Sequence, residues 1–304
     1  MHSEEIAILI PTHNRKEHLV QCLNMLLDQT ILPKNIIIID DGSTDGTTDI
    51  LRSKFNFVEI IKGNGELWWT GAVNRGIEYV LKNLKTVKGV ILLNDDVVIL
   101  KDWFENFVKD IAVNKHSLIG CVNVNYKDKC TITWAGKKHN NKWLSLSTNN
   151  FVGENVSLIS LSHRYINSFD LIGRGLFIPC EVFKKVGLFD EKHFKHRGDT
   201  ELPLRARLNG FKLIVSFNTI IYNMPEETAK IDIKKRYGLR DFKYKFFDFR
   251  SSSFWKYRYY YTKIYSNNFI HHGVLFAFSM LCHLFNYVRR LKYLSIPGYL
   301  KDKK

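Results

Sequence analysis

The chain has 304 residues, of which 45% are hydrophobic, and a formal net charge of +15 at pH 7. This length and composition predict a folded protein, either one large domain or one domain with an appendage, and exclude a disordered chain. Its five cysteines are widely spaced and form no Cys-x-x-Cys pair, which argues against a disulfide scaffold or a zinc site and favours a reducing compartment.

The first residues, MHSEEIAILI, carry acids where a secretory signal would carry bases, so we expect a protein that is not exported. Residues 5–11 form an apolar run that predicts a buried strand, and the segment THNR follows it as a loop. Residues 15–29 then show apolar side chains at helical spacing, which predicts an amphipathic helix.

A second buried strand is predicted at residues 36–39, and it runs directly into the acidic segment DDGSTD. Gly42 permits a tight turn there, and Ser43 or Thr44 can cap the next helix. Residues 57–61 predict a third strand, and the glycine-flanked segment GNGELWWTGA predicts a loop leading into a helix at 71–84. The two tryptophans of this loop either cover the core or form a wall for a ring-shaped ligand.

Residues 90–93 predict a fourth buried strand, which ends abruptly in Asn94, Asp95 and Asp96. In an open α/β sheet, ligands bind outside the carboxyl ends of the strands. Two adjacent acids at that edge are well placed to hold a divalent cation against the phosphates of a substrate. The alternative interpretation is a solvated turn, because Asn and Asp are favoured turn residues.

A helix at 101–114 and a strand at 118–124 complete four rounds of strand, loop and helix, which predicts an α/β fold with a parallel sheet and its loops on one rim. From residue 125 to 168 the pattern weakens, and we expect a meander or an insertion that could determine partner specificity. A strand is then predicted at 169–179 and a short helix at 181–186.

Asp199 can cap a further helix that ends at Gly210, and residues 211–217 and 219–222 close the domain as strands.

The segments just described resemble the family-2 glycosyltransferases with the GT-A fold. The resemblance covers about residues 6–222 in five ordered blocks: IPTHNR, IIIIDDGSTDGT, GNGELWWTGAVNRGI, LLNDDV, and GRGLFIPCEVFKKVGLFDE followed by GDTELPLRARLNGF. The WWTGA wording is most similar to bacterial rhamnosyltransferase-like enzymes of surface-polysaccharide synthesis. The family resemblance implies a Rossmann-like, mostly parallel sheet in a catalytic domain at 1–224, with the nucleotide-sugar half at about 1–124 and the acceptor half at about 125–224.

The resemblance implies that a nucleotide diphosphate sugar, with UDP or dTDP as carrier, binds across the first half of the sheet. Asp41 would accept a hydrogen bond from the imino N–H of a pyrimidine base, and Pro11 and His13 would lie along the face of that base. The other residues implied for nucleotide-sugar binding are Asn14, Trp69, Asn74, Asn94, Asp95, Arg174 and Arg205. Arg205 could equally form a structural ion pair.

The resemblance also implies a metal cofactor, Mg²⁺ or Mn²⁺, held by Asp96 with help from Asp95 or Asn94 and bridging the diphosphate oxygens of the donor. Many relatives place a histidine after the final strand to complete this site, whereas this chain has Asn223, a weaker ligand.

Asp199 matches the general base of the family, which removes the proton of the acceptor hydroxyl as that oxygen attacks the anomeric carbon. A base on the side of the sugar opposite the diphosphate implies a single displacement with inversion of configuration. The motif position before it, commonly Glu, is Gly198 here.

The tail from residue 225 to 304 has a different character, with 17 Lys and Arg against 6 Asp and Glu and with aromatic residues between the basic ones. Its apolar stretch at 273–288 is shorter than the roughly 20 residues that span a bilayer, which favours an interfacial helix on an anionic membrane. The alternative is a pair of helices that pack on the catalytic domain or on another protomer in a homo-oligomer.

The leading hypothesis is therefore an inverting hexosyltransferase that acts on a glycan or lipid-linked acceptor at the inner face of the cytoplasmic membrane. A sugar-1-phosphate nucleotidyltransferase is the second, but PTHNRKEH lacks the glycine-rich basic phosphate loop that such an enzyme needs. A nucleic-acid-binding protein is the third, but the acids at 40, 41, 95 and 96 would repel a phosphate backbone, so we expect no nucleic-acid partner.

Overall fold

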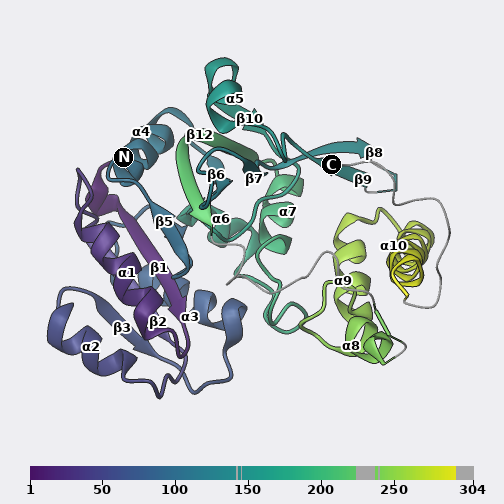
Figure 1. Cartoon of the computed structure of the whole chain (residues 1–304), viewed down its shortest axis with the longest axis horizontal. Helices are drawn as coiled ribbons and strands as arrows, with labels where there is room; N and C mark the ends of the chain where they lie inside the picture. The colour runs from purple at the N-terminus through teal and green to yellow at the C-terminus, as the bar shows by residue number, and fades with distance from the viewer. Residues whose placement is uncertain (142, 145, 224–236, 239, 292–304) are drawn as a thin grey trace. The chain divides into compact units, whose positions relative to one another are not determined.

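A computed structural model describes residues 1–141, 143–144, 146–223, 237–238 and 240–291 (Figure 1). The chain divides into two compact units, Met1–Ala229 and Lys230–Lys304. The domain boundary predicted between residues 224 and 225 lies outside the described residues.

The first unit is built on a mixed sheet with the strand order β10-β12-β6-β11-β4-β1-β2-β3. Its parallel strands β3, β2, β1 and β4 lie side by side, whereas β11 runs antiparallel between β4 and β6. The bounds are β1 Ile6–Thr12, β2 Asn35–Asp40, β3 Glu59–Lys62, β4 Gly89–Leu92, β6 Ser117–Asn125, β10 Tyr165–Asn167, β11 Leu176–Pro179 and β12 Lys212–Asn223. This arrangement confirms the predicted α/β fold with a mostly parallel sheet.

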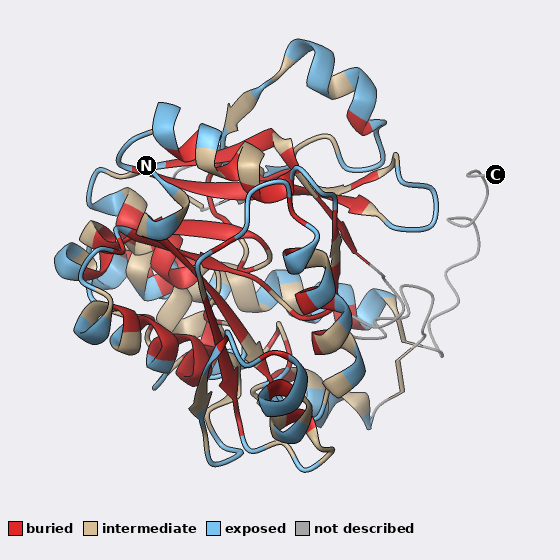
Figure 2. Cartoon of the chain, turned by 90° about the vertical axis from the view of Figure 1, so that its left-hand side faces the viewer, coloured by how far each residue is buried: buried red, intermediate tan, exposed pale blue. Residues whose placement is uncertain are grey.

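Helices cover both faces of this sheet because successive strand residues point to opposite sides. Ile6, Ile8 and Ile10 of β1 join one core cluster with α1, α2 and α4, while Ala7 and Leu9 join a second cluster with α3, α6 and α7. Figure 2 shows these strands as buried ribbons inside the helical layers. The helices are α1 Lys16–Leu27, α2 Thr47–Lys54, α3 Trp68–Asn83, α4 Trp103–Val113, α6 Cys180–Val186 and α7 Glu201–Leu208.

Several predicted boundaries were wrong at the ends of elements. The helix expected from residue 71 begins at Trp68, so both tryptophans belong to the first turn of α3 rather than to a loop. Gly46, not Ser43 or Thr44, is the N-cap residue of α2. The two strands expected at the end of the domain are one strand, β12, whose register against β6 shifts between Ser216 and Ile220.

The segment that the sequence left unplaced, from residue 125 to 168, forms short elements along the second half of the sheet. They include a separate two-stranded sheet made by β8 and β9. The bounds are β7 Ile132–Trp134, β8 Lys137–Asn141, β9 Leu146–Asn149 and α5 Val156–Ser162; β5, Val97–Ile99, is an unpredicted strand that pairs with β12.

The second unit is helical, as predicted, with α8 Asp241–Phe247, α9 Trp255–Tyr265 and α10 Phe269–Arg289. His272 of α10 lies 3.0 Å from the carbonyl oxygen of Tyr259 and packs edge-on against its ring, which joins α10 to α9. At 21 residues α10 exceeds the predicted apolar stretch. Within the described residues it is the one helix long and apolar enough to cross a membrane, although core helices of soluble proteins also meet these criteria.

Candidate active site

The predicted functional residues of the first half lie at one edge of the sheet, where the parallel strands end. Thr12, the last residue of β1, pairs with Asp40, the last residue of β2. On the other side of β1, Leu9 pairs with Leu92, the last residue of β4. The residues that follow these strands, around 13, 41 and 95, are therefore brought to a common edge.

The acid doublet Asp95-Asp96 is buried at this edge. The hydroxyl of Thr12 donates a 2.8 Å hydrogen bond to Asp95 Oδ2, and the Arg15 guanidinium lies 3.1 Å from Asp95 Oδ1 and 3.3 Å from Asp96 Oδ2. Burial raises the pKa of Asp95 to about 6, helped by the charge of Asp96 and opposed by Arg15 and by the Thr12 hydrogen bond.

The donor atoms of the doublet fit a hard divalent cation. Asp96 Oδ1 is buried and has no hydrogen-bond partner among the described residues, and a bound metal ion would satisfy this oxygen. Within the same residues, no group of three or more His, Cys, Asp or Glu side chains is placed to hold a metal. The protein would thus supply two carboxylates, and phosphate oxygens and water the remaining ligands, as is usual for Mg²⁺.

The role of Asn223 as a metal ligand stays a prediction. Asn223 pairs with Val97, directly after Asp96, so its backbone lies beside the acid doublet. However, its side-chain Oδ1 accepts a 3.0 Å hydrogen bond from the hydroxyl of Thr133.

Asp41 is a buried cap for the start of α3. Its Oδ1 accepts the N–H of Gly65 at 2.8 Å, and its Oδ2 accepts the N–H of Trp68 at 3.0 Å. A carboxylate at the N-terminus of a helix satisfies unpaired N–H groups and is favoured by the helix dipole. Each oxygen retains a second lone pair, so the predicted hydrogen bond to a base stays chemically available.

The first loop is joined to the loop after β2. His13 Nδ1 lies 2.5 Å from the carbonyl oxygen of Asp41, so this nitrogen carries the proton and Nε2 accepts from Asn14 Nδ2 at 3.1 Å. Asn14 has a left-handed backbone, with φ of 51°, and its Oδ1 accepts the N–H of Thr44 at 2.7 Å. These bonds hold the exposed imidazole beside Asp41. Pro11, predicted to lie along the same base, is the second-last residue of β1.

The first turn of α3 connects the three sets of predicted residues. The backbone of Trp68 bonds to Asp41, and the ring N–H of Trp69 donates a 3.3 Å hydrogen bond to Asn94 Oδ1, next to the acid doublet. A Cβ built on Gly173 would collide with the Trp69 ring, so this ring lies directly against the loop before β11. Trp69 thereby joins the end of β4 to the second half of the sheet.

Asp199 lies beside Gly173, the residue that meets the Trp69 ring. Its Oδ2 accepts a 3.3 Å hydrogen bond from the N–H of Gly173, and its side chain is half-buried. It is not the helix cap that the sequence predicted, because Thr200 is the N-cap residue of α7. Residues 41, 94–96 and 199 therefore converge around Trp68 and Trp69, although they are far apart in the sequence.

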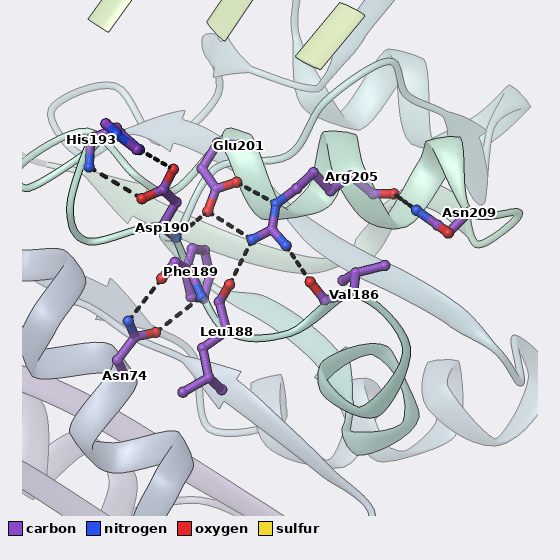
Figure 3. Close-up of polar contacts among 9 residues, drawn as sticks. All are labelled: Asn74, Val186, Leu188, Phe189, Asp190, His193, Glu201, Arg205 and Asn209. Carbon is purple, nitrogen blue, oxygen red and sulfur yellow. Dashed lines mark hydrogen bonds and ion pairs between the residues drawn. The ribbon is translucent and has the colours of Figure 1, made fainter. Parts of the chain in front are cut away.

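Arg205 has the structural role that the sequence left as the alternative (Figure 3). Its guanidinium bonds to Glu201 at 2.7 and 3.0 Å, to the carbonyl oxygen of Leu188 at 2.6 Å, and to that of Val186. Four of its donors are thus directed at the protein, and the contact with the donor phosphates stays a prediction. Burial raises the pKa of Glu201, and the ion pair with Arg205 opposes this shift.

Asn74 likewise bonds to the protein. Its amide donates to the carbonyl oxygen of Phe189 at 2.9 Å and accepts the N–H of the same residue at 3.1 Å, as Figure 3 shows. This two-way bond ties α3 to the turn after α6, 115 residues later. The nucleotide-sugar contact of Asn74 stays a prediction, and both groups of its amide already have protein partners.

The Nε of Arg174 is buried and has no hydrogen-bond partner in the described part of the chain, so it is available to an anionic ligand. The role of Arg174 in nucleotide-sugar binding stays a prediction. Thr12, Arg15 and Gly173 were not predicted as site residues. Arg15 could have been found, because the loops after two adjacent parallel strands, β1 and β4, lie side by side and carry opposite charges.

The family model described as Glycosyl transferase family 2 matches residues 7–184. The glycosyltransferase GlyG of Streptococcus pneumoniae is 23% identical over 70% of this chain and 67% of its own length, and AglE of Haloferax volcanii is 27% identical over 71% and 65%. This chain thus corresponds to about two thirds of these curated relatives.

A solved structure of GalNAc-T7 with UDP, GalNAc and Mn²⁺ has the same fold, with a TM-score of 0.55 and 15% identity over 72% of this chain and 43% of that one. This likeness confirms the predicted GT-A fold. With the family model matching more than half of its residues, the chain belongs to glycosyl transferase family 2.

Proposed function

We propose that the protein is an inverting glycosyltransferase that moves a sugar from a UDP- or dTDP-sugar to a hydroxyl of a glycan or lipid-linked acceptor in bacterial surface-polysaccharide synthesis. One observation carries the proposal: the acid doublet, Asp41 and Asp199 meet around the first turn of α3. Family membership supports the activity, and the UDP and Mn²⁺ of GalNAc-T7 support a nucleotide donor and a divalent cofactor.

The residues divide the work along the sheet edge. Asp41 and His13 bind the base, and the backbone bonds of Gly65 and Trp68 hold the Asp41 carboxylate in a fixed orientation. Asp95 and Asp96 hold Mg²⁺ or Mn²⁺, which when bound neutralises charge on the diphosphate leaving group. The indole of Trp69 lies between these acids and Asp199 and forms a wall for the sugar ring.

Asp199 accepts the proton of the acceptor hydroxyl, and the resulting oxygen forms a bond to the anomeric carbon as the bond from that carbon to the diphosphate breaks. The proton stays on Asp199 and the electron pair leaves with the nucleoside diphosphate. Gly173 contributes by its lack of a side chain, which lets the Trp69 ring and the Asp199 carboxylate approach each other.

A panel of nucleotide sugars, scored by release of nucleoside diphosphate with and without Mn²⁺, tests the proposal. We expect Mn²⁺-dependent turnover with at least one UDP- or dTDP-sugar, and its loss in Asp96→Asn. Asp28→Asn, an exposed acid paired with Lys101, is the control and should keep full activity. The anomeric proton coupling of the product, compared with that of the donor, tests inversion. Turnover with no donor, or turnover unaffected by Asp96→Asn, would contradict the proposal.

We further propose that α10 places the enzyme on an anionic membrane surface from the cytoplasmic side. Its side chains Ile270, Val274, Leu281, Phe285 and Val288 are exposed. They recur at helical spacing and form one apolar stripe, while His271, Leu275 and Tyr287 on other faces are buried. Together with the basic excess of residues 225–304, such a stripe suits an interfacial helix.

Co-sedimentation with vesicles tests this placement. We expect binding to vesicles that contain anionic lipid, weaker binding to neutral vesicles, and loss of binding in Leu281→Asp with Phe285→Asp. Leu158→Asp with Leu161→Asp, which adds the same two charges at exposed positions of α5, is the matched control. Unchanged vesicle binding together with a monomer–dimer shift in sedimentation would assign the stripe to a homo-oligomer interface instead.

A further inference from the structure

Arg15 lies between the two acids of the proposed metal site. It is the N-cap residue of α1, and its guanidinium contacts Asp95 Oδ1 at 3.1 Å and Asp96 Oδ2 at 3.3 Å. The two carboxylates are 5% and 4% exposed, whereas the Arg15 side chain is 34% exposed. The two carboxylates are thus almost inaccessible to water, while the Arg15 guanidinium reaches them from the surface.

The oxygens of the doublet have distinct partners. Asp95 Oδ2 is taken by the Thr12 hydroxyl, Asp95 Oδ1 and Asp96 Oδ2 face Arg15, and Asp96 Oδ1 has no hydrogen-bond partner among the described residues. Arg15 Nε, although 3.1 Å from Asp95, makes no aligned hydrogen bond. The attraction is therefore mainly a matter of charge, and such a contact is easier to replace than a bidentate hydrogen-bonded fork.

Asp96 Oδ1 is open to a divalent cation, but both oxygens of Asp95 already have partners, Thr12 on Oδ2 and Arg15 on Oδ1. A cation that uses both acids therefore competes with Arg15 for Asp95 Oδ1. Two buried carboxylates side by side require positive charge near them, which the guanidinium supplies when no metal is bound. When a metal replaces it, the guanidinium needs another anion, and the diphosphate of a donor provides one at the same edge.

We propose that Arg15 is a positioning residue that competes with the divalent metal for Asp95 and Asp96, so that metal binds tightly only together with a nucleoside diphosphate. This inference rests on the proposed function, since it concerns the metal and donor of that same site. Binding linkage is reciprocal, so the nucleotide must also bind more tightly when metal is present, by the same factor.

Isothermal titration of the full chain measures this coupling without any turnover. Mn²⁺ is titrated alone and with saturating UDP, into wild type, Arg15→Gln and Lys16→Gln. Lys16→Gln is a matched control, because it removes the same charge one residue away, and Lys16 Nζ bonds to the carbonyl oxygen of Asp45 rather than to the doublet.

In the wild type we expect UDP to tighten Mn²⁺ binding by on the order of tenfold, within the usual range of coupling between two sites. Arg15→Gln should bind Mn²⁺ alone more tightly than the wild type, and UDP should then add little. Lys16→Gln should keep the wild-type coupling. Equal or weaker Mn²⁺ binding by Arg15→Gln in the absence of UDP would overturn the proposal.

A folding defect in Arg15→Gln, detected by circular dichroism, does not remove the test. Arg15→Met keeps the apolar stem of the side chain but removes the charge, so it should tighten Mn²⁺ binding in the absence of UDP as Arg15→Gln does. No shift would overturn the inference. If wild type bound no Mn²⁺ even with UDP, the proposed function would fall and this inference with it, whereas normal wild-type binding with unchanged variants would overturn this inference alone.

Discussion

Adding one methyl group at Gly173 should separate the two halves of the proposed site. An ideal Cβ at this position lies 2.8 Å from Cη2 of Trp69, even closer to Cζ2 of the same ring, and 3.2 Å from Cβ of Asp199. The backbone of Gly173 is not left-handed, so alanine causes no backbone strain there. Only steric overlap of the methyl group with its neighbours opposes the substitution. Either the indole or the Asp199 loop must move, at a cost of about 1–3 kcal/mol in the free energy of unfolding.

The same displacement should lower the transfer rate by about a hundredfold, since a shift of about 1 Å in a positioned group has that effect. Gly71→Ala is the matched control: it adds a methyl group two residues from Trp69, where the nearest atoms are 3.4–3.7 Å away. Inside a helix that change should stabilise the protein by up to about 1 kcal/mol. Urea unfolding and a nucleotide-release assay measure both effects, and wild-type stability and rate in Gly173→Ala would refute the reasoning.

Three further predictions address other parts of the site. Asp41→Asn turns an NH₂ group toward the N–H of Gly65 or Trp68 and should lower the free energy of unfolding by about 1–3 kcal/mol in urea; full stability would contradict the capping role. Arg205→Lys should destabilise the protein by about 3 kcal/mol without raising the donor KM, and the reverse pattern would support its phosphate-binding role. Because the pKa of Asp95 is raised to about 6 in the metal-free protein, Mn²⁺ must displace a proton below that pH. Its affinity by titration should therefore fall by up to about tenfold per pH unit below 6, and stay level above it.

The sequence was informative wherever local pattern decides the structure. Buried strands that end in acids, at residues 41 and 95–96, could be placed at one edge because carboxyl ends of parallel strands share an edge. The assignment of Asp199 as the base is a prediction from a resemblance of motifs, and its contact with Gly173 could not be read from local pattern.

Contacts between distant residues could not be predicted from the sequence. Asn74 and Arg205 have the side chains of ligand-binding residues, but each bonds to main-chain groups near the turn after α6, and no local signal reveals such partners. The first turn of α3 was misplaced for a similar reason. Trp68 has a positive φ of 56°, and its N–H bonds to Asp41 in the loop after β2, so tertiary contacts rather than helix propensity set this boundary.

The central claim, that distant acids form one catalytic site around the first turn of α3, is tested most directly by Asp199→Asn. Asn keeps an oxygen for the Gly173 N–H but cannot accept the proton of the acceptor hydroxyl. We predict a loss of about a hundred- to ten-thousand-fold in transfer rate, or roughly 3–5 kcal/mol of transition-state stabilisation, with unchanged affinity for UDP in the presence of Mn²⁺. Transfer at the wild-type rate by this variant would contradict the account.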